Sequence, residues 1–349
     1  MPDTEKQFEA DIEAFLLSDT GGWAKADDSG YRAEASKGKA LDIETLVAFV
    51  KATQPVMWQR FEKQCNINPT QKFYQCLDTA IQKDGLIAVL RHGFGYRGMK
   101  FRICYFKPGS TLNSEAVARY RQNVCQCIRQ WHYSEQNNNS VDVMLAINGI
   151  PVVAIELKNQ LTGQNIDNGK KQWMFDRDPR EPAFKLNNRI LVFFAVDLYE
   201  AAMTTQLAGA KTFFLPFNQG SCGAGNDGGK GNPQSTDNDY VTSYLWKDVL
   251  QKDSLLDLIQ KFVSQIVKDD KPSLKKVIFP RFQQMDVVRK LIADVREHGA
   301  GRNYLVQHSA GSGKSNSIAW TAYRLTNLLK PIVDRYGTLN DGNAISSDA

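Results

Sequence analysis

Two acidic residues and a lysine interrupt two consecutive runs of apolar residues near the middle of the sequence. Asp142 lies in the run VDVMLAI, and Glu156 and Lys158 lie in the following run, PVVAIELK. Glu156 and Lys158 are two positions apart, so on a β-strand their side chains share one face. Burying charged groups among apolar side chains is unfavourable unless they pair or bind a metal ion. The three residues are therefore candidates for a site that does chemistry.

The chemistry that this set supports is metal-dependent hydrolysis of a phosphodiester. Carboxylate oxygens, here from Asp142 and Glu156, are ligands that Mg²⁺ prefers, and the cation would relieve their mutual repulsion. Mg²⁺ polarises the scissile phosphate and lowers the pKa of a bound water, while Lys158 can orient that water and stabilise the developing charge. The alternative is a structural cross-strand salt bridge at a sheet edge, because the E-x-K spacing also arises by chance.

The loop between the two runs decides whether the two acids can share a face. Asn148-Gly149 is a strong hairpin signal between strand-like runs. A two-residue loop would leave Asp142 and Glu156 on opposite faces of the hairpin. A three-residue loop, with Gly149 at a left-handed bulge position, sets Asp142 directly opposite Glu156. If the three residues form a functional site, we therefore expect the three-residue, bulged loop.

Two further residues are candidates for the same catalytic site. Glu9, on the first predicted helix, could supply another acid, and Gln172, on the helix after the hairpin, could contact phosphate or orient the site. The alternative for each is an ordinary solvated helix residue. The region around Gln172 is also basic, which suits a DNA backbone, although a charge run is often only a solvated face. The basic residues there are Lys170, Lys171, Arg177 and Arg180.

Residues 308–315, HSAGSGKS, are close to the Walker A pattern G-x-x-x-x-G-K-S/T and lie between a strand-like run and a helix. Such a loop wraps phosphates with backbone N–H groups at a helix N-terminus. Lys314 would reach the β/γ-phosphates of ATP and Ser315 the Mg²⁺, while His308 departs from the first glycine of the pattern. The candidate nucleotide-binding residues of the loop are Gly311, Ser312, Gly313, Lys314 and Ser315.

Gln284 precedes this loop by some thirty residues, in the segment PRFQQMDVVRKL. Its amide could read adenine through two hydrogen bonds, and the alternative is an exposed helix residue. After the loop the sequence shows neither a second acidic motif for Mg²⁺ and water nor an arginine finger. We therefore expect ATP binding with an incomplete hydrolysis apparatus.

The composition indicates a cytoplasmic protein of two or three domains. The 349 residues exceed one ordinary domain of about 150 residues. The net charge of +5 permits a nucleic-acid partner without demanding one. The six cysteines show no C-x-x-C pair, so we expect reduced thiols. The acidic N-terminus does not resemble a signal peptide, and no apolar run reaches the ~20 residues of a membrane span.

The pattern of runs predicts an α/β protein with a mixed sheet. We expect a domain at 1–217 that carries the acid–lysine set, a Gly-rich loop or linker at 218–237, a helical connector at 238–271 and a P-loop unit at 272–349. The expected elements are helices at 4–18, 114–130, 166–177, 240–268, 281–298 and 314–329, and strands at 101–106, 141–147, 151–158, 189–196, 200–206, 211–217 and 303–308. The tail GTLNDGNAISSDA is expected to be disordered.

Two other patterns are set aside. The G-x-G-x-x-G of residues 93–98 follows a helix-like run and precedes a strand, the reverse of a dinucleotide fold, so we interpret it as a turn. Cys125 and Cys127 fall in the predicted helix 114–130, where their sulfurs would point in different directions, so a metal site there is discounted.

Many stretches of the sequence resemble the restriction (R) subunit of type I restriction-modification enzymes. They run from about residue 4 to 330 and are TEKQFEADIEAFLL, LRHGFGYRGMKFRICYF, VDVMLAINGIPVVAIELKN with LTGQN, TTQLAGAKTFFLPFNQG, SYLWKDVLQKDSLLDLI, IFPRFQQMDVVRKL and NYLVQHSAGSGKSNSIAW. A nuclease hairpin followed by a motor-type P-loop is an informative order, and the stretches together are highly specific.

The resemblance implies a PD-(D/E)xK restriction-endonuclease-like mixed sheet flanked by helices, followed by a partial RecA-like domain of a superfamily 2 motor. It implies Mg²⁺ and ATP as cofactors and cleavage of double-stranded DNA coupled to ATP-driven translocation. It also implies methylation and specificity subunits as partners. Asp142, Glu156 and Lys158 match the nuclease motif, and Gln284 matches the adenine-reading glutamine. The alternatives are a non-catalytic module that binds DNA or docks on the methylation and specificity subunits, and a P-loop protein whose E-x-K is structural.

Overall fold

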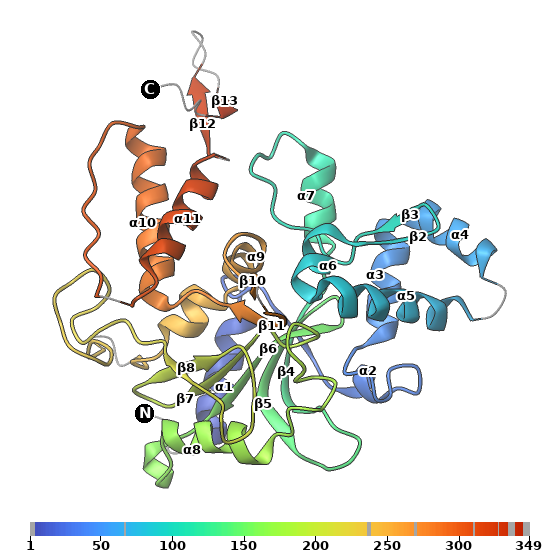
Figure 1. The fold of residues 1–349 in the computed structure, drawn as a ribbon, viewed down its shortest axis with the longest axis horizontal. Helices are drawn as coiled ribbons and strands as arrows, with labels where there is room; N and C mark the ends of the chain where they lie inside the picture. The colour runs from blue at the N-terminus through green and yellow to red at the C-terminus, as the bar shows by residue number, and fades with distance from the viewer. Residues whose placement is uncertain are drawn as a thin grey trace.

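A mixed seven-stranded sheet forms the centre of the molecule in a computed structural model (Figure 1). The structure describes residues 4–65, 68–235, 239–268, 271–309, 311–326, 328–333 and 339–344. The strand order is β1-β4-β5-β6-β7-β8-β9, in which β1 with β4 and β6 with β7 are parallel and the other neighbours antiparallel. The strands are β1 (Ala24–Ala26), β4 (Cys125–His132), β5 (Ser140–Ile147), β6 (Ile150–Leu157), β7 (Val192–Val196), β8 (Ala201–Thr204) and β9 (Leu215–Pro216).

The central strands β5 and β6 are buried on both faces of the sheet. In β5, Val143, Leu145 and Ile147 belong to one apolar cluster, whereas Met144 and Ala146 belong to a second cluster across the sheet. Burial on two sides explains why these strands are almost continuously apolar in sequence. It also means that every charged residue within them is held in a site of low polarity.

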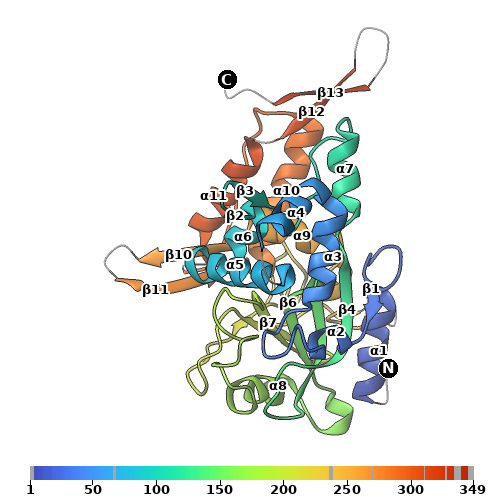
Figure 2. The ribbon, with the colours of Figure 1, turned by 90° about the vertical axis from the view of Figure 1, so that its right-hand side faces the viewer.

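Helix α1 (Glu5–Leu16) covers the face of the first cluster, as its predicted amphipathic pattern requires. Its buried stripe is Phe8, Ile12 and Leu16, and the Thr4 side chain caps its first turn. Helix α8 (Ile166–Lys171) and the π-helix η2 (Gln172–Asp176) cover the opposite face, where Trp173 packs in the second cluster. Figure 2 shows α1 and α8 at the same end of the molecule, so residues of both helices can reach the sheet there.

A helical layer lies beside the sheet. It contains α2 (Ser29–Arg32), α3 (Ile43–Thr53), α4 (Pro55–Gln64), α5 (Pro69–Asp84), α6 (Leu86–His92), the β2 (Phe94–Tyr96) and β3 (Met99–Phe101) hairpin and α7 (Ser114–Arg121). The turn predicted at residues 93–98 is part of this hairpin, whereas the strand predicted at 101–106 is wrong because β3 ends at Phe101.

The helix predicted at 114–130 is correct only in its first half. After α7 the chain enters β4, whose buried residues alternate with more exposed ones over much of its length. That period of two belongs to a strand, so Cys125 and Cys127 point to the same face, contrary to the prediction. Both are free thiols in the core, and burial raises the pKa of each to about 12.

The last part of the chain is mainly helical. It contains the π-helix η3 (Leu245–Val249), α9 (Lys252–Lys261), β10 (Ser264–Lys268), β11 (Lys271–Ile278), α10 (Phe282–His298), α11 (Lys314–Leu325), β12 (Leu329–Val333) and β13 (Leu339–Ala344). The helix predicted over 240–268 is thus interrupted and ends in a strand. Residues 303–308 form no strand, and Leu305 is 93% exposed because no neighbouring strand covers it. The tail GTLNDGNAISSDA is predicted to be disordered, but its residues 339–344 form β13, which pairs with β12; residues 337–338 and 345–349 lie outside the described residues.

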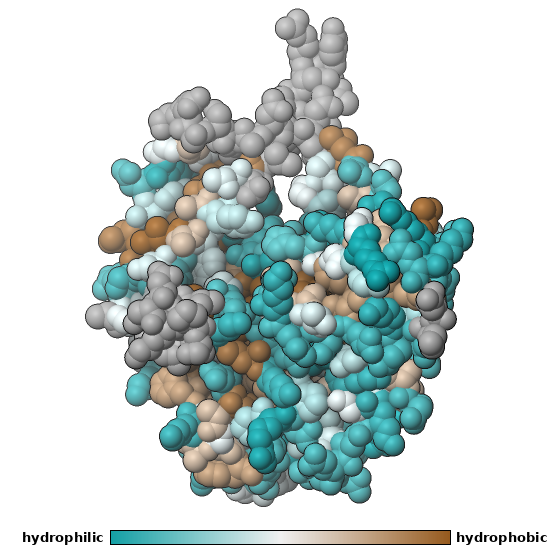
Figure 3. All heavy atoms as spheres, turned by 45° about the vertical axis from the view of Figure 1, so that its right-hand side comes forward, coloured by the Kyte–Doolittle hydropathy of each residue, from teal (hydrophilic) through white to brown (hydrophobic). Residues whose placement is uncertain are grey.

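The surface is mixed in polarity. On the face in Figure 3, apolar side chains form separate patches between hydrophilic ones. Isolated exposed apolar residues of this kind are normal in globular proteins. Among the described residues, no helix has both the length and the apolar character needed to cross a bilayer.

Candidate active site

The loop that joins β5 and β6 is a tight two-residue turn. Asn148 and Gly149 both have left-handed backbone angles, with φ of 52° and 78°, and pairing begins at the residues that flank them. The predicted three-residue loop is therefore wrong. The turn is held from both sides, since Asn148 Oδ1 accepts a hydrogen bond from the Val124 backbone at 2.7 Å and the Gly149 carbonyl accepts one from Asp42 at 2.9 Å.

A β-bulge inside the hairpin shifts the pairing by one residue, as a three-residue loop would have done. The register shifts between Leu145 and Ala146. The Cα partners around the shift are Ala146 with Pro151, Leu145 with Val153, and Val143 with Ile155. Continuing this register by one residue sets Asp142 opposite Glu156, which is the arrangement that the functional interpretation required. Pro151 has no N–H to offer to the ladder, so it is well suited to a position beside a bulge.

The Asp142 carboxylate is fixed by two donors. Its Oδ2 accepts a hydrogen bond from the Leu157 backbone N–H at 2.7 Å, and its Oδ1 accepts one from Gln130 Nε2 at 3.2 Å. The same Gln130 amide donates to Glu9 Oε2 at 3.1 Å, and Gln130 has a left-handed φ of 50°. Gln130 therefore links two carboxylates that are far apart in sequence. No sequence pattern pointed to this residue.

Glu156 is a fully buried carboxylate with one oxygen left over. Its Oε1 accepts hydrogen bonds from Arg177 Nε at 3.0 Å and Arg177 Nη2 at 2.5 Å. Its Oε2 is buried and has no hydrogen-bond partner among the described atoms. Burial and the charge of Asp142 raise the pKa of Glu156 well above its ordinary value, while Arg177 and Lys158 oppose that rise. Buried polar atoms normally have a hydrogen-bond partner, so this free oxygen is a candidate ligand atom for an ion.

Lys158 lies where helices α1 and α8 meet the end of β6. Its Nζ donates to the Leu157 carbonyl at 2.7 Å and lies 3.6 Å from Glu5 Oε1. Helix α8 approaches closely, because a Cβ on Gly169 would lie 3.5 Å from Lys158 Cγ. Burial raises the pKa of Glu5, Lys158 opposes that rise, and Asp142 adds to it. Glu5 is thus an acid of this site that the sequence interpretation missed, although it precedes Glu9 by one helical turn.

The two additional candidates have different surroundings. Glu9 is only 3% exposed, pairs with Arg129 at 2.5 Å and reaches Asp142 through Gln130, so it is not a solvated helix residue. Gln172 is half-buried at the start of η2. No described contact joins its side chain to the acid–lysine set, so its role stays a prediction.

The basic segment after the hairpin is less available to DNA than its sequence indicates. Arg177 is 4% exposed and held by Glu156. Lys170 and Arg180 each pair with an aspartate of their own segment, at 3.0 Å and 2.7 Å. Lys171 is exposed. The sequence shows that these residues are basic, but it does not show which of them are buried, paired or exposed.

The donor set fits a small, hard cation with few protein ligands. Across the described part of the chain, no group of three or more His, Cys, Asp or Glu side chains could hold a metal. Asp142 and Glu156 are two carboxylates, and the unpartnered Glu156 Oε2 is an available ligand atom. Mg²⁺ commonly binds through one or two carboxylates and otherwise keeps water. The pair is therefore a better match for Mg²⁺ than for a metal that needs a full protein cage.

The predicted nucleotide loop leads directly into α11, with Gly313 at the helix N-cap. Gly311 and Gly313 have left-handed φ of 73° and 82°, and Ala310 lies outside the described residues. Lys314 Nζ donates to the carbonyls of His308 and Ser309 at 3.0 Å and 3.1 Å. The lysine thus lies over the loop, and Ser315 is exposed beside it.

Gln284 lies against this loop. It is 4% exposed, so its alternative as an exposed helix residue is wrong. Its Nε2 donates to the carbonyls of Ser312 and Gly313 at 2.9 Å and 3.1 Å. A Cβ at position 313 would lie 2.3 Å from that nitrogen, so the contact requires glycine there.

The fold and the site define an α/β protein in which two carboxylates and a lysine lie at the open end of the central β5–β6 hairpin of a mixed sheet. Residues 5–212 match the model of the family described as "Type I restriction enzyme R protein N terminus", and the chain belongs to this family. The match includes the whole acid–lysine set and ends before the P-loop.

A relative from Methanocaldococcus jannaschii bears the name "Putative type I restriction enzyme MjaVIIIP endonuclease subunit". It is 25% identical over 237 residues, which are 65% of this chain and 21% of that protein. The chain thus spans about a fifth of the length of this relative.

Proposed function

We propose that the chain is a DNA-cleaving part of a type I restriction system, with a Mg²⁺-dependent centre of the PD-(D/E)xK type. The observation that carries this proposal is the buried Glu156 Oε2, which has no partner and belongs to a strand register that sets Glu156 opposite Asp142. A structural salt bridge would satisfy both oxygens of a buried carboxylate. The family match to an R protein supports the same activity.

In this mechanism Asp142 and Glu156 would hold Mg²⁺, which would supply Lewis-acid polarisation of the phosphate and a more acidic water. Lys158 orients the attacking water and stabilises the charge that develops on the phosphate. Gln130 keeps the Asp142 carboxylate in position through its hydrogen bond of 3.2 Å. Glu5 lies 3.6 Å from the lysine and is suited to take a proton from it or return one.

We further propose the division into an endonuclease domain at 1–217, a Gly-rich loop at 218–237, a connector at 238–271 and a partial RecA-like unit from 272. In the complete system, double-stranded DNA and the methylation and specificity subunits are the partners, and ATP drives translocation. The contacts of Gln284 with the loop carbonyls support ATP binding by this unit. Lys314 would then contact the phosphates of ATP, and Ser315 would help to hold their Mg²⁺.

The test is cleavage of circular duplex DNA by the purified chain with Mg²⁺, with and without ATP and partner subunits. Asp142→Ala and Lys158→Ala should each lower the cleavage rate by about 10²-fold or more, because each removes a group that acts on the reacting phosphate. Lys83→Ala, at an exposed position of α5, is the control and should cleave like the wild type.

Robust cleavage by either site variant would overturn the assignment. A wild-type chain that binds the partner subunits but never nicks DNA at any Mg²⁺ concentration would instead identify a non-catalytic assembly module.

A further inference from the structure

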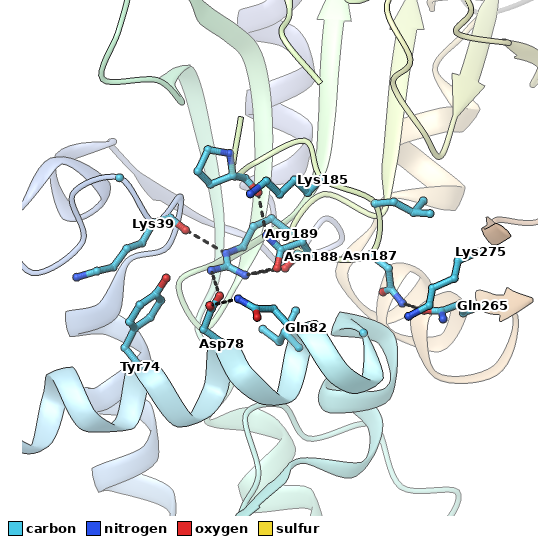
Figure 4. Close-up of a pocket in the computed structure, with 15 residues that line it drawn as sticks. Lys39, Tyr74, Asp78, Gln82, Lys185, Asn187, Asn188, Arg189, Gln265 and Lys275 are labelled. Carbon is cyan, nitrogen blue, oxygen red and sulfur yellow. Dashed lines mark hydrogen bonds and ion pairs between the residues drawn. The ribbon is translucent and has the colours of Figure 1, made fainter. Parts of the chain in front are cut away.

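A cavity of about 430 Å³ opens between helix α5, the loop that precedes β7 and the β10–β11 hairpin (Figure 4). Cavities of this size commonly bind small organic molecules. Its lining includes neither the acid–lysine set nor the nucleotide loop, so it is distinct from both sites described above.

A buried guanidinium forms the floor of this cavity. Arg189 is 2% exposed; its Nε donates to the Lys39 carbonyl at 3.2 Å and its Nη1 to the Asn188 carbonyl at 2.8 Å. Its Nη2 lies 3.6 Å from Asp78 Oδ1 on α5. Among the described residues, Asp78 is the only acidic one that lines the cavity. The Asp78 carboxylate faces the Arg189 guanidinium, so the described lining offers no further carboxylate to its lysines.

One wall is held rigidly by Asn187. Its Oδ1 accepts a hydrogen bond from the Ile87 backbone at 3.0 Å, and its Nδ2 donates to Gln265 Oε1 of β10. A Cβ at Gly85 would lie 2.0 Å from Asn187 Nδ2, so the α5–α6 turn lies directly against this wall. The cavity thus joins three segments far apart in sequence and keeps its shape without a ligand.

Two lysines complete the lining. Lys185, from the loop before β7, and Lys275, from β11, are both exposed (Figure 4). The described residues give neither of them an ion pair. Together with Arg189 they make the cavity strongly positive despite Asp78. Two unpaired ammonium groups over a buried guanidinium are an arrangement suited to an anion.

We propose that this cavity binds a phosphorylated ligand the size of a mononucleotide, with Lys185 and Lys275 contacting the phosphate. The volume exceeds what a single phosphate fills. Gln82 and Gln265 also line the cavity. Gln82 Nε2 donates to Asp78 and Gln265 Oε1 accepts from Asn187, which leaves Gln82 Oε1 and Gln265 Nε2 to bond to the edge of a base. The phosphate comes either from a free nucleotide or from a nucleotide within a DNA strand.

The experiment measures binding to the full-length chain by calorimetry, in a Lys314→Ala background that weakens nucleotide binding at the P-loop. The probes are dAMP and a short single-stranded oligonucleotide. Lys185→Gln combined with Lys275→Gln should weaken binding of dAMP at least about tenfold, the effect of losing one charge-assisted contact or more. Lys63→Gln combined with Lys100→Gln makes the same change of charge at exposed positions of α4 and β3 that do not line the cavity, and it should leave affinity unchanged.

Each result has a defined meaning. Selective loss of dAMP affinity in the cavity variant supports a free-nucleotide site, and selective loss of oligonucleotide affinity alone assigns the phosphate to a DNA strand. Equal losses in both double variants would overturn the proposal, since only net charge would then matter. Undetectable binding of both probes to the parent protein would overturn it as well.

Discussion

At the scale of single residues, the site is organised around a carboxylate whose surroundings oppose its charge. Glu156 is completely buried, and Arg177 engages only one of its two oxygens. The hydrogen bonds of Gln130 and the Leu157 backbone fix Asp142 nearby, so the two negative charges cannot move apart freely. An arrangement that is unfavourable without a cation is typical of a functional site, where stability is lower than the same fold could reach.

Replacing Glu156 by Gln should therefore raise the free energy of unfolding at pH 7 to 8 in the absence of Mg²⁺. The folded-state pKa of Glu156 is raised above its ordinary 4.5. Between those two values the folded state keeps a proton that the unfolded state has lost, so wild-type stability falls as pH rises through this window. The advantage of Glu156→Gln should consequently vanish near pH 4, as measured by urea unfolding.

Mg²⁺ should make the wild type more stable than the Glu156→Gln variant. A cation that binds only the folded wild type raises its free energy of unfolding with the logarithm of the cation concentration once that exceeds Kd, whereas the Gln variant has lost a ligand. Glu135→Gln, which changes an exposed acid, should show neither effect and is the matched control. A wild type whose unfolding does not respond to Mg²⁺, or a Gln variant that responds equally, would contradict a metal role for Glu156.

At the scale of elements, the β5–β6 hairpin is the part that positions the site. Its two-residue turn would by itself place the acids on opposite faces, and the bulge beyond it restores the correct pairing. The turn is fixed by buried contacts, because Asn148 is fully buried and the Gly149 backbone lies against Asp42. The position of the turn therefore sets the register that brings Asp142 to Glu156.

Gly149→Ala should lower the free energy of unfolding by about 3 kcal/mol. Alanine at a left-handed φ costs about 1–2 kcal/mol, and here its Cβ would also lie 2.3 Å from the Asp42 carbonyl oxygen. Gly163→Ala is the control, because Gly163 has a similar φ of 80° but open space around its Cβ. Gly163→Ala should lower the free energy of unfolding only by the cost of alanine at a left-handed φ, about 1–2 kcal/mol. Equal losses in the two variants would show that the turn is free to move away from Asp42.

The same hairpin shows how far sequence reasoning could go. The residue types predicted two strands and an Asn-Gly turn, and the structure confirms both. The shared face for the acids was expected from a three-residue loop, whereas the register that sets them opposite each other comes from a bulge within the hairpin. The position of the bulge could not be predicted from the sequence, because it depends on contacts of the turn with Val124 and Asp42, which are distant in the sequence. Gln130 was missed for a similar reason, since its importance arises only when β4 lies beside β5.

Other elements were mispredicted where local preference and tertiary pairing disagree. Residues 125–130 extend a helical pattern but form a strand, because β1 and β5 provide partners on both sides. Conversely, residues 303–308 have a strand-like composition but pair with nothing among the described residues. A strand exists only where a neighbour takes up its backbone hydrogen bonds, and sequence alone does not supply that neighbour.

At the scale of the whole molecule, the P-loop helix is attached to the sheet through the connector. One continuous cluster of buried apolar residues runs from Phe8 of α1 to Trp320 of α11. Trp320 contacts Phe262 at the end of α9, with ring centroids 5.4 Å apart. Arg324 of α11 pairs with Asp257 of α9 at 2.7 Å. The connector α9 is thus one of the elements that join the two proposed units, which also contact each other directly where Phe217 packs against Phe282 of α10.

The Asp257–Arg324 pair gives a direct measure of this attachment. Both side chains are largely buried, at 24% and 13% exposed, so a double-mutant cycle of Asp257→Asn and Arg324→Gln should give a coupling energy of about 1–2 kcal/mol at pH 7. The exposed pair Glu115–Arg119 within α7, cycled in the same way, should give about 0.5 kcal/mol or less. Chemical unfolding followed by circular dichroism provides all the values.

The pH dependence of that coupling has a defined sign. Burial raises the pKa of Asp257, but Arg324 and Lys261 more than offset it, so the folded-state pKa lies below the ordinary 3.8. The pair therefore contributes its full stability above pH 3.8, and this contribution is lost as the pH falls through the lower folded-state value. A coupling energy no larger than that of Glu115–Arg119, or one unchanged at pH 3, would mean that α9 and α11 do not stabilise each other through this contact. The P-loop unit would then be attached to the rest of the protein through apolar contacts, such as those of Phe262 with Trp320 and of Phe217 with Phe282.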